Sequence, residues 1–330
     1  MTQAAAQSSA SATADVIVVG AGPAGSSAAY HMATLGLDVI LLEKQELGRD
    51  KVCGDGLTPS AVRELVSMGV DTSGWQRNRG LRVIGGGHLL HFPWPEQASF
   101  PSYGMARPRA LLDRDLAEHA AAAGARLLTG VTVTGPVTSP TGRVTGVEAR
   151  PTNRVAYPGI EGPTTFTAPL VIDAGGVSAR LATAVGRTKN ERRPMGVAVR
   201  AYFRSPRAKD AWMESRLELW DGAPGKSDLL PGYGWIWSVG EGLVNVGLGS
   251  VSSRAQATAI DYRAVFNRWM DNVPASWGFT QENQVGGLVS AALPMAFNRK
   301  PHYADGLMLL GDAGGMVSPF NGEGIAQALM

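Results

Sequence analysis

The sequence predicts an α/β fold, in which parallel strands alternate with helices and a mainly antiparallel segment is inserted between them. Three observations support this prediction. An apolar strand, Val16–Val19, runs into a glycine-rich turn and an alanine-rich helix, and a second apolar strand follows at 38–42. Two further apolar strands, at 169–173 and 306–310, also run into glycines. Residues 196–253 instead contain short strand patterns separated by turns, which is typical of an antiparallel sheet.

The turn after the first strand has the spacing of a dinucleotide-binding motif. Gly20 allows the tight turn, Gly22 lets the backbone approach a pyrophosphate, and Gly25 lets the helix pack closely on the strand. The N-terminus of that helix then presents N–H groups and a partial positive charge to the ligand. Glu43 ends the second strand where an acid that binds ribose is expected, and we assign Lys44 to the same site. The pattern predicts a Rossmann-like domain.

The far end of the chain indicates which dinucleotide is bound. An apolar strand there runs into Gly311-Asp312, and Gly322-Glu-Gly324-Ile325 opens a helix. This pair of segments resembles the second flavin fingerprint of the FAD-dependent oxidoreductase and hydroxylase superfamily. In that superfamily the Asp meets the ribityl chain or pyrophosphate, and the helix start lies near the flavin pyrimidine edge, where it stabilises the reduced anion. The resemblance implies FAD rather than NAD, bound by Asp312, Gly324 and Ile325.

Composition excludes several classes of protein. The 330 residues are 44% hydrophobic and 18% charged, with a net charge of +2, and no run of Lys and Arg indicates nucleic acid. No apolar run approaches the ~18 residues of a transmembrane helix. Residues 1–13 lack the features of a signal peptide and are predicted to be a disordered tail. A single cysteine, Cys53, fits a reducing cytoplasm. No metal site is predicted.

The order of the patterns predicts a discontinuous FAD-binding domain over 14–75, 105–190 and 285–330, with a substrate domain over 76–104 and 191–284. Because 326–330 stop in the first turns of a predicted helix without a C-cap signal, we expect further helices beyond Met330. Gly240-Glu-Gly242 predicts a hairpin turn. The other expected elements are helices at 109–124 and 261–272, strands within 125–150, and strands at 197–203, 216–220, 233–237 and 243–248.

Three internal segments narrow the family. They contain Cys53-Gly54-Asp55-Gly56-Leu57, then Arg107-Pro-Arg109, and finally Tyr233-Gly-Trp235 with Gly247-Leu-Gly249 after the hairpin. Together with the two flavin fingerprints, these segments resemble the geranylgeranyl reductase family, most closely its bacterial menaquinone side-chain reductase branch, over residues 14–330.

The resemblance implies a function and a set of site residues. Such an enzyme saturates isolated C=C bonds of a polyprenyl chain, on a menaquinone or a geranylgeranyl lipid. Its electrons come from an unidentified donor (NADPH, ferredoxin or another), and it contacts the cytoplasmic membrane peripherally. In the family, one loop lies against the flavin and the substrate tunnel, an arginine opens a helix that meets FAD, a backbone group holds the adenine, and aromatic residues line the substrate cavity. In this sequence the resemblance assigns the loop to Cys53, Gly54 and Gly56, and the arginine to Arg109. It assigns the adenine-binding backbone group to Val133 and the cavity aromatics to Tyr233 and Trp235.

The chemistry requires a proton donor as well as a flavin hydride, because an isolated isoprene bond is unpolarised. Cys53 and Tyr233, with reference pKa values of about 8.5 and about 10, are both protonated at neutral pH. We therefore select Cys53, Tyr233 and Trp235 as catalytic candidates. Tyr233, Trp235 and Trp237 share one face of a predicted strand, which favours cavity lining over proton donation, with core packing as the alternative. Asp55 either orients Cys53 or caps a turn.

Two departures from the family keep alternatives open. Trp237-Ser238 stand where the family has Phe-Pro, and Ala174 stands where related hydroxylases have an acid. The second candidate function is a FAD-dependent monooxygenase or halogenase, since Trp235-Ile-Trp237 partly resembles a halogenase segment. A third is a prenyl carrier without redox chemistry. A product that gains oxygen or halogen would identify the second, and an intact double flavin fingerprint disfavours the third.

Overall fold

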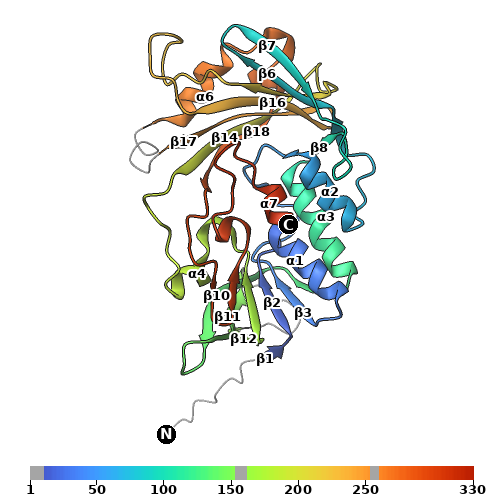
Figure 1. Ribbon diagram of the computed structural model, residues 1–330, viewed down its shortest axis with the longest axis vertical. Coiled ribbons are helices and arrows are strands. Elements are labelled where there is room, and N and C mark those ends of the chain that lie inside the picture. The colour runs from blue at the N-terminus through green and yellow to red at the C-terminus, as the bar shows by residue number, and fades with distance from the viewer. Residues whose placement is uncertain (1–10, 153–161, 253–259) are drawn as a thin grey trace. The chain divides into compact units, whose positions relative to one another are not determined.

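The computed structural model describes residues 11–152, 162–252 and 260–330, which form two compact units (Figure 1). The first unit contains residues up to 49 together with 113–189 and 299–314, and the second contains 50–112, 190–298 and 315–330. Each unit is therefore built from discontinuous segments. Four segments that we grouped with the FAD-binding domain lie in the second unit: 50–75, 105–112, 285–298 and 315–330.

The first unit is built on a six-stranded sheet in the order β19-β20-β13-β2-β3-β9, in which every pair except β19–β20 is parallel. The central strands β2 and β3 are runs of Val, Ile and Leu, and every residue in them except Val19 is buried. The strands are β2 (Val16–Val19), β3 (Val39–Leu42), β9 (Arg126–Leu128), β13 (Leu170–Asp173), β19 (Tyr303–Ala304) and β20 (Leu307–Leu309).

Helices cover this sheet. Helix α1 (Pro23–Thr34) lies alongside β2 and β3 in Figure 1, and Ala29 packs with Val18 and Leu41. Helix α3 (Arg109–Ala122) contributes Ala117 and Ala120 to the same core. The short helices are α4 (Arg180–Ala184) and the 3₁₀ turns η1 (Gly176–Ser178) and η4 (Gly311–Ala313).

A second, four-stranded sheet in this unit corrects one expectation. Residues 11–13, which we placed in a disordered tail, form β1 (Ser11–Thr13) and pair in parallel with β12. Pairing with β12 satisfies backbone N–H and C=O groups on one side of β1, a tertiary contact that the composition of the tail does not reveal. Residues 1–10 lie outside the described residues. The other strands are β10 (Val131–Thr138), β11 (Val144–Pro151) and β12 (Thr164–Thr167), so strands within 125–150 are confirmed.

The second unit is built on a seven-stranded sheet in the order β18-β14-β17-β16-β15-β6-β7. One face packs against α6 (Tyr262–Met270), where Ile236 and Val246 meet Phe266 and Trp269. The strands are β6 (Gly80–Gly85), β7 (His88–Pro93), β14 (Met195–Arg204), β15 (Trp212–Arg216), β16 (Gly232–Gly240), β17 (Leu243–Ser252) and β18 (Gln284–Pro294). Smaller elements are β4 (Gly56–Leu57), β5 (Gln76–Asn78), β8 (Gly104–Ala106), α2 (Pro59–Ser67), α7 (Ile325–Leu329), η2 (Ala275–Trp277) and η3 (Gln281–Asn283).

Most of the expected elements in this unit are confirmed, including the β16–β17 hairpin and helix α6, whose N-cap Asp261 accepts hydrogen bonds from two backbone N–H groups. The strand expected at 216–220 is wrong, because β15 ends at Arg216. Sequence patterning missed β15 because its centre is polar: Glu214 is 2% exposed and pairs with Arg82 and Arg216. Among the described residues, no helix is both long and apolar enough to span a membrane.

Candidate active site

The dinucleotide motif and the Gly311-Asp312 turn meet at the carboxyl ends of the strands in the first unit's sheet. Strands β2, β13 and β20 are parallel neighbours, so the turns that follow them lie side by side. The Ala174 N–H donates to the Val19 carbonyl at 2.9 Å, and the Leu310 N–H donates to the Asp173 carbonyl at 3.0 Å. The turn at Gly20 and the turn at Asp312 are therefore brought together.

The turn itself has the shape that a pyrophosphate requires. A Cβ on Gly25 would lie 1.8 Å from the Gly20 carbonyl oxygen, so Gly25 is needed for the helix to pack on the turn. A Cβ on Gly22, in contrast, would have no atom of the described residues within 4 Å. Gly22 is the N-cap of α1 and, in the described structure, no side chain caps that helix and its first turn has no acidic residue. The uncapped N–H groups and the open space fit an anionic ligand such as the FAD pyrophosphate.

Glu43 lies across the same turn. Its Oε2 accepts the Ala21 N–H at 3.0 Å, and its backbone carbonyl accepts the Val131 N–H at 2.9 Å. The Thr152 hydroxyl donates to the Lys44 carbonyl at 2.6 Å. These bonds place the ends of β3 and β11 and the start of β10 together, so that Glu43, Lys44 and the predicted adenine-binding Val133 on β10 lie in one region.

The acid that hydroxylases carry in this region is absent from position 174, and the neighbouring Asp173 has a structural role. Its carboxylate accepts the N–H groups of Gly175 and Ala182, both at 3.0 Å, and is 1% exposed. Burial raises the pKa of Asp173, while those two hydrogen bonds and the nearby Arg299 oppose the rise. Asp173 therefore holds the turn together.

The second unit carries the Cys53 thiol, whose loop contacts a row of hydrogen-bonding side chains on adjacent strands of the sheet. Tyr202 on β14, Asn245 on β17 and Trp237 on β16 are directly opposite one another in the strand register. The next residues on that face of β17 are Gly247 and Gly249. A Cβ on Gly247 would lie 2.3 Å from the Trp235 ring, so the glycine makes room for the indole.

The loop from Cys53 to Gly56 is fixed on this face by side chains of the sheet. The Trp237 indole N–H donates to the Gly54 carbonyl, and Asn245 Nδ2 donates to the Cys53 carbonyl at 2.9 Å. Trp235 in turn donates to Asn245 Oδ1 at 2.8 Å. A Cβ on Gly54 would lie 2.6 Å from the Trp237 ring, and one on Gly56 would collide with Met213. Trp235 and Trp237, stacked with ring centroids 5.9 Å apart, thus position the loop that carries Cys53.

The Cys53 thiol is in surroundings that favour its protonated form. Its Sγ accepts the Asp55 N–H at 3.3 Å. Burial raises the pKa of the Cys53 thiol above its usual value, and the negative charge of Asp55 adds to the rise. The Arg109 guanidinium, which also hydrogen-bonds the thiol, and the Asp55 N–H oppose it. Cys53 as a whole residue is partly exposed.

Tyr233 lies on the same strand face, with its ring centroid 6.2 Å from that of Trp235. Its hydroxyl donates to the Asn321 carbonyl at 2.6 Å. Burial raises the pKa of Tyr233 to about 12, and the nearby Glu323 adds to the rise. The catalytic roles of Tyr233 and Trp235 stay predictions, and the hydrogen bonds that they make are those of positioning residues.

The predicted site residues divide between the two units. Gly324 is the N-cap of α7 and Ile325 is buried in its first turn, both in the second unit. The first unit holds Gly20, Gly22, Gly25, Glu43, Lys44, Val133 and Asp312, and the second holds Cys53, Gly54, Gly56, Arg109, Tyr233, Trp235, Gly324 and Ile325.

Sequence reasoning missed Tyr202 and Asn245. Both carry polar groups inside otherwise apolar strand patterns, at 197–203 and 243–248, and that interruption was the available signal. Their hydrogen bonds to the Cys53–Gly56 loop are tertiary contacts, which a local sequence pattern does not predict.

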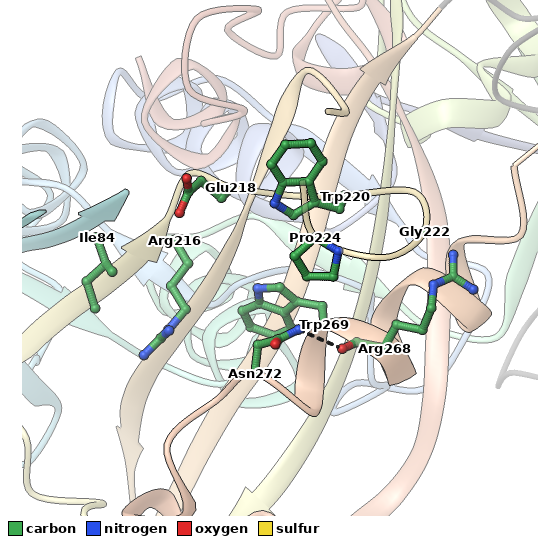
Figure 2. Close-up of a pocket in the computed structure, with 9 residues that line it drawn as sticks. All are labelled: Ile84, Arg216, Glu218, Trp220, Gly222, Pro224, Arg268, Trp269 and Asn272. Carbon is green, nitrogen blue, oxygen red and sulfur yellow. Dashed lines mark hydrogen bonds between the residues drawn. The ribbon is translucent and has the colours of Figure 1, made fainter. Parts of the chain in front are cut away.

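A cavity of about 180 Å³ lies elsewhere in the second unit (Figure 2). It includes Trp269 of α6, which packs against Gly234 on β16. Gly234 faces away from Trp235 because side chains alternate along a strand, so this cavity is on the opposite side of the sheet from Cys53. None of the predicted site residues lines it: its walls are Ile84, Arg216, Glu218, Trp220, Gly222, Pro224, Arg268, Trp269 and Asn272.

The fold and the sheet edge define a flavoprotein. The chain belongs to the FAD-binding domain family, which matches residues 13–330, and within it to the branch that includes the menaquinone reductases. It is a FAD-dependent oxidoreductase, and FAD is its cofactor.

Three relatives carry this assignment. The menaquinone reductase of Mycolicibacterium smegmatis is 38% identical over 320 residues, covering 96% of this chain and 74% of the relative. A digeranylgeranylglycerophospholipid reductase of Methanothermobacter thermautotrophicus is 29% identical, with the same coverage. Among solved structures, a geranylgeranyl bacteriochlorophyll reductase-like protein of Thermoplasma acidophilum superposes with a TM-score of 0.78 at 25% identity, covering 97% of this chain and 76% of that one.

A myxobacterial chondrochloren halogenase also has the fold, with a TM-score of 0.73. At 22% identity, with 96% of this chain and 72% of that one covered, this likeness shows shared architecture only. Because the sequence is more similar to the reductases, the halogenase alternative is not favoured.

Proposed function

We propose that this protein saturates isolated C=C bonds of a polyprenyl chain, with the side chain of menaquinone as its substrate. The observation that carries the proposal is the Cys53 thiol, which is kept protonated by burial and by Asp55 and is fixed by two tryptophans. The similarity to menaquinone reductases supports the substrate class.

An isolated double bond gains a hydride at one carbon and a proton at the other. Reduced FAD, when bound, supplies the hydride and is oxidised. The Cys53 S–H bond breaks as the new C–H bond forms, and the thiolate that remains regains a proton from water. Arg109 and the Asp55 N–H, which both hydrogen-bond the sulfur, stabilise that thiolate. Each turnover would consume two electrons, which an external donor such as NADPH or ferredoxin would have to supply.

The two alternatives lack comparable support. A monooxygenase of the hydroxylase type carries an acid at the position of Ala174, and Asp173 is fully engaged with the backbone. A prenyl carrier does not need FAD, whereas this chain belongs to a FAD-binding family.

The substrate is membrane-bound, and we extend the proposal to peripheral contact with the cytoplasmic face of the membrane. Strand β7 is exposed along its whole length and presents Leu89, Leu90 and Phe92, each about half exposed. Apolar side chains on a surface strand can insert at the boundary between head groups and acyl chains.

The proposal is tested with the FAD-loaded full-length protein, reduced without oxygen and mixed with menaquinone. The expected product is two mass units heavier. Cys53→Ala should slow this step by ~10²–10⁴-fold with FAD still bound, as is typical when a general acid is lost. Cys53→Ser is the matched control, because it keeps the shape but supplies a weaker acid. Full turnover by Cys53→Ala removes the thiol from the mechanism, and a product that gains oxygen or halogen overturns the reductase function.

A further inference from the structure

We propose that Asp55 is a positioning residue for the reaction: its carboxylate, clamped by Tyr202 and Asn245, keeps the Cys53 thiol protonated beside the Arg109 guanidinium until substrate arrives. The inference rests on the proposed role of Cys53 as proton donor. It goes beyond that role because it assigns the control of the proton to Asp55, within the Cys53–Leu57 segment, and to Tyr202 and Asn245, which lie outside the family segments.

The carboxylate is held by three hydrogen-bond donors. Tyr202 Oη donates to Asp55 Oδ2 at 2.5 Å, and Asn245 Nδ2 donates to the same oxygen at 2.7 Å. The Arg109 backbone N–H donates to Oδ1 at 3.1 Å. Only a carboxylate accepts at both oxygens, since an amide in this place would turn its NH₂ group toward one of the donors. The site is therefore built for an ionised Asp55.

Asp55 is tied to the thiol through its own backbone. It is fully buried, and its φ of +63° lies in the left-handed region that Asp and Asn tolerate better than most residues. In this conformation its N–H reaches Cys53 Sγ while its side chain turns toward β14 and β17. One residue thus couples the sheet to the sulfur.

The charges around the pair act in opposite directions. Burial raises the pKa of Asp55 to about 6, and its hydrogen bonds and Arg200 limit the rise. Asp55 is therefore mostly ionised at pH 7.5, and its negative charge opposes thiolate formation at Cys53, whereas Arg109 promotes it. The charged or titratable groups that act on Cys53, Asp55 or Tyr202 are Arg109 from α3, Arg200 and Tyr202 from β14, Tyr233 from β16 and Asp50 from the same loop.

This balance gives the thiol two states. Burial raises the pKa of the Cys53 thiol most, and the charge of the ionised Asp55 adds to this rise, against Arg109 and the two hydrogen-bond donors directed at the sulfur. Once the proton has moved to substrate, the same two donors stabilise the thiolate. Removing the Asp55 charge should therefore make the resting thiol more acidic.

The test measures the thiol directly, without substrate. The FAD-loaded full-length protein is treated with iodoacetamide between pH 6 and 10, and alkylation of Cys53 is followed by peptide mass spectrometry. Asp55→Asn keeps the size and the tolerance of positive φ but removes the charge. We expect its alkylation rate at pH 7.5 to rise about tenfold, which corresponds to a fall of one unit in the thiol pKa. Asp71→Asn, the same change at an exposed residue of the second unit, should stay within twofold of wild type.

A second variant keeps the proposal open to refutation if Asp55→Asn does not fold. Tyr202→Phe removes one donor from the ionised carboxylate, so Asp55 should protonate at higher pH. Its alkylation rate should exceed wild type at pH 7 and converge with it at pH 9, where Asp55 is ionised in both proteins. Unchanged profiles in every folded variant refute the positioning role, even if Cys53→Ala is still slow. A shifted profile together with full turnover by Cys53→Ala instead refutes the proposed function.

Discussion

Gly22 and Gly25 lie three residues apart in one turn, yet the protein structure itself requires a glycine only at Gly25. Gly25 has no room for a side chain, because the Gly20 carbonyl lies where its Cβ would stand. Gly22 has a backbone conformation open to other residues, with φ of −78°, and open space beside it. Gly25 therefore serves the fold, and we propose that Gly22 serves the ligand.

This contrast predicts the behaviour of two single substitutions. Gly22→Ala should raise the Kd for FAD by at least about tenfold, or ~1.4 kcal/mol, because the added methyl group occupies the space assigned to the pyrophosphate. The melting temperature of the FAD-free protein should stay unchanged. Gly25→Ala, the matched control, should weaken FAD binding and also lower the melting temperature. Titration of the apoprotein by flavin fluorescence and thermal denaturation measure these effects, and FAD affinity at the wild-type level in Gly22→Ala would contradict the pyrophosphate assignment.

Strands β16 and β17 form the element on which the thiol loop depends. Their register places Trp235 opposite Gly247 and Trp237 opposite Asn245, so one strand supplies indoles while the other supplies space and a bridging amide. The aromatic face is thus fixed by cross-strand pairs, which are the unit of stability in a sheet.

The two glycines of β17 offer a matched test of that packing. A Cβ on Gly247 would lie 2.3 Å from Trp235 and 2.6 Å from the Val199 carbonyl, whereas one on Gly249 would lie at 3.5 Å or more from its neighbours. Gly247→Ala should lower the free energy of unfolding by ~1–3 kcal/mol through overpacking and should disturb the Cys53 loop. Gly249→Ala should be close to neutral. Urea denaturation compares them, and equal stability of the two variants would show that Trp235 repacks freely.

Local patterns predicted much of this element, and tertiary contacts explain the rest. The shared face of Tyr233, Trp235 and Trp237 follows from the two-residue period of a strand, and the structure confirms it. The role of Trp237 as a donor to Gly54 could not be predicted, because the two residues are 183 positions apart. Strand β15 was not predicted because its central residue, Glu214, is a buried charged residue that forms ion pairs with Arg82 and Arg216.

At the scale of the whole molecule, the net charge of +2 is too small to direct the protein to one class of partner. The exposed apolar side chains of β7 are a more specific feature, because Leu90 and Phe92 lie on one face of a strand at the sheet edge. Binding of β7 to a membrane would therefore depend on these apolar side chains.

We expect the full-length protein to float with vesicles of phosphatidylglycerol and phosphatidylethanolamine. The double substitution Leu90→Ser and Phe92→Ser should reduce the bound fraction severalfold, because it removes the apolar surface that inserts. Leu35→Ser is the control, since Leu35 is 79% exposed but lies at the end of α1. If all of the wild-type protein stays in the bottom fraction with every lipid tested, peripheral binding is excluded. If the β7 variant and Leu35→Ser lose the same share of vesicle binding, β7 is excluded as the binding surface.

The position of β20 in the first unit's sheet has a consequence for biosynthesis. This strand is the parallel neighbour of β13, although it lies at 307–309 and β13 lies at 170–173. A ribosome therefore releases four of the six strands long before β20 exists, and until then β13 has an unpaired edge. The turn that carries Asp312 emerges later still. The nascent chain must protect a hydrophobic edge while more than a hundred further residues are made, so acquisition of the flavin belongs to the last stage of maturation.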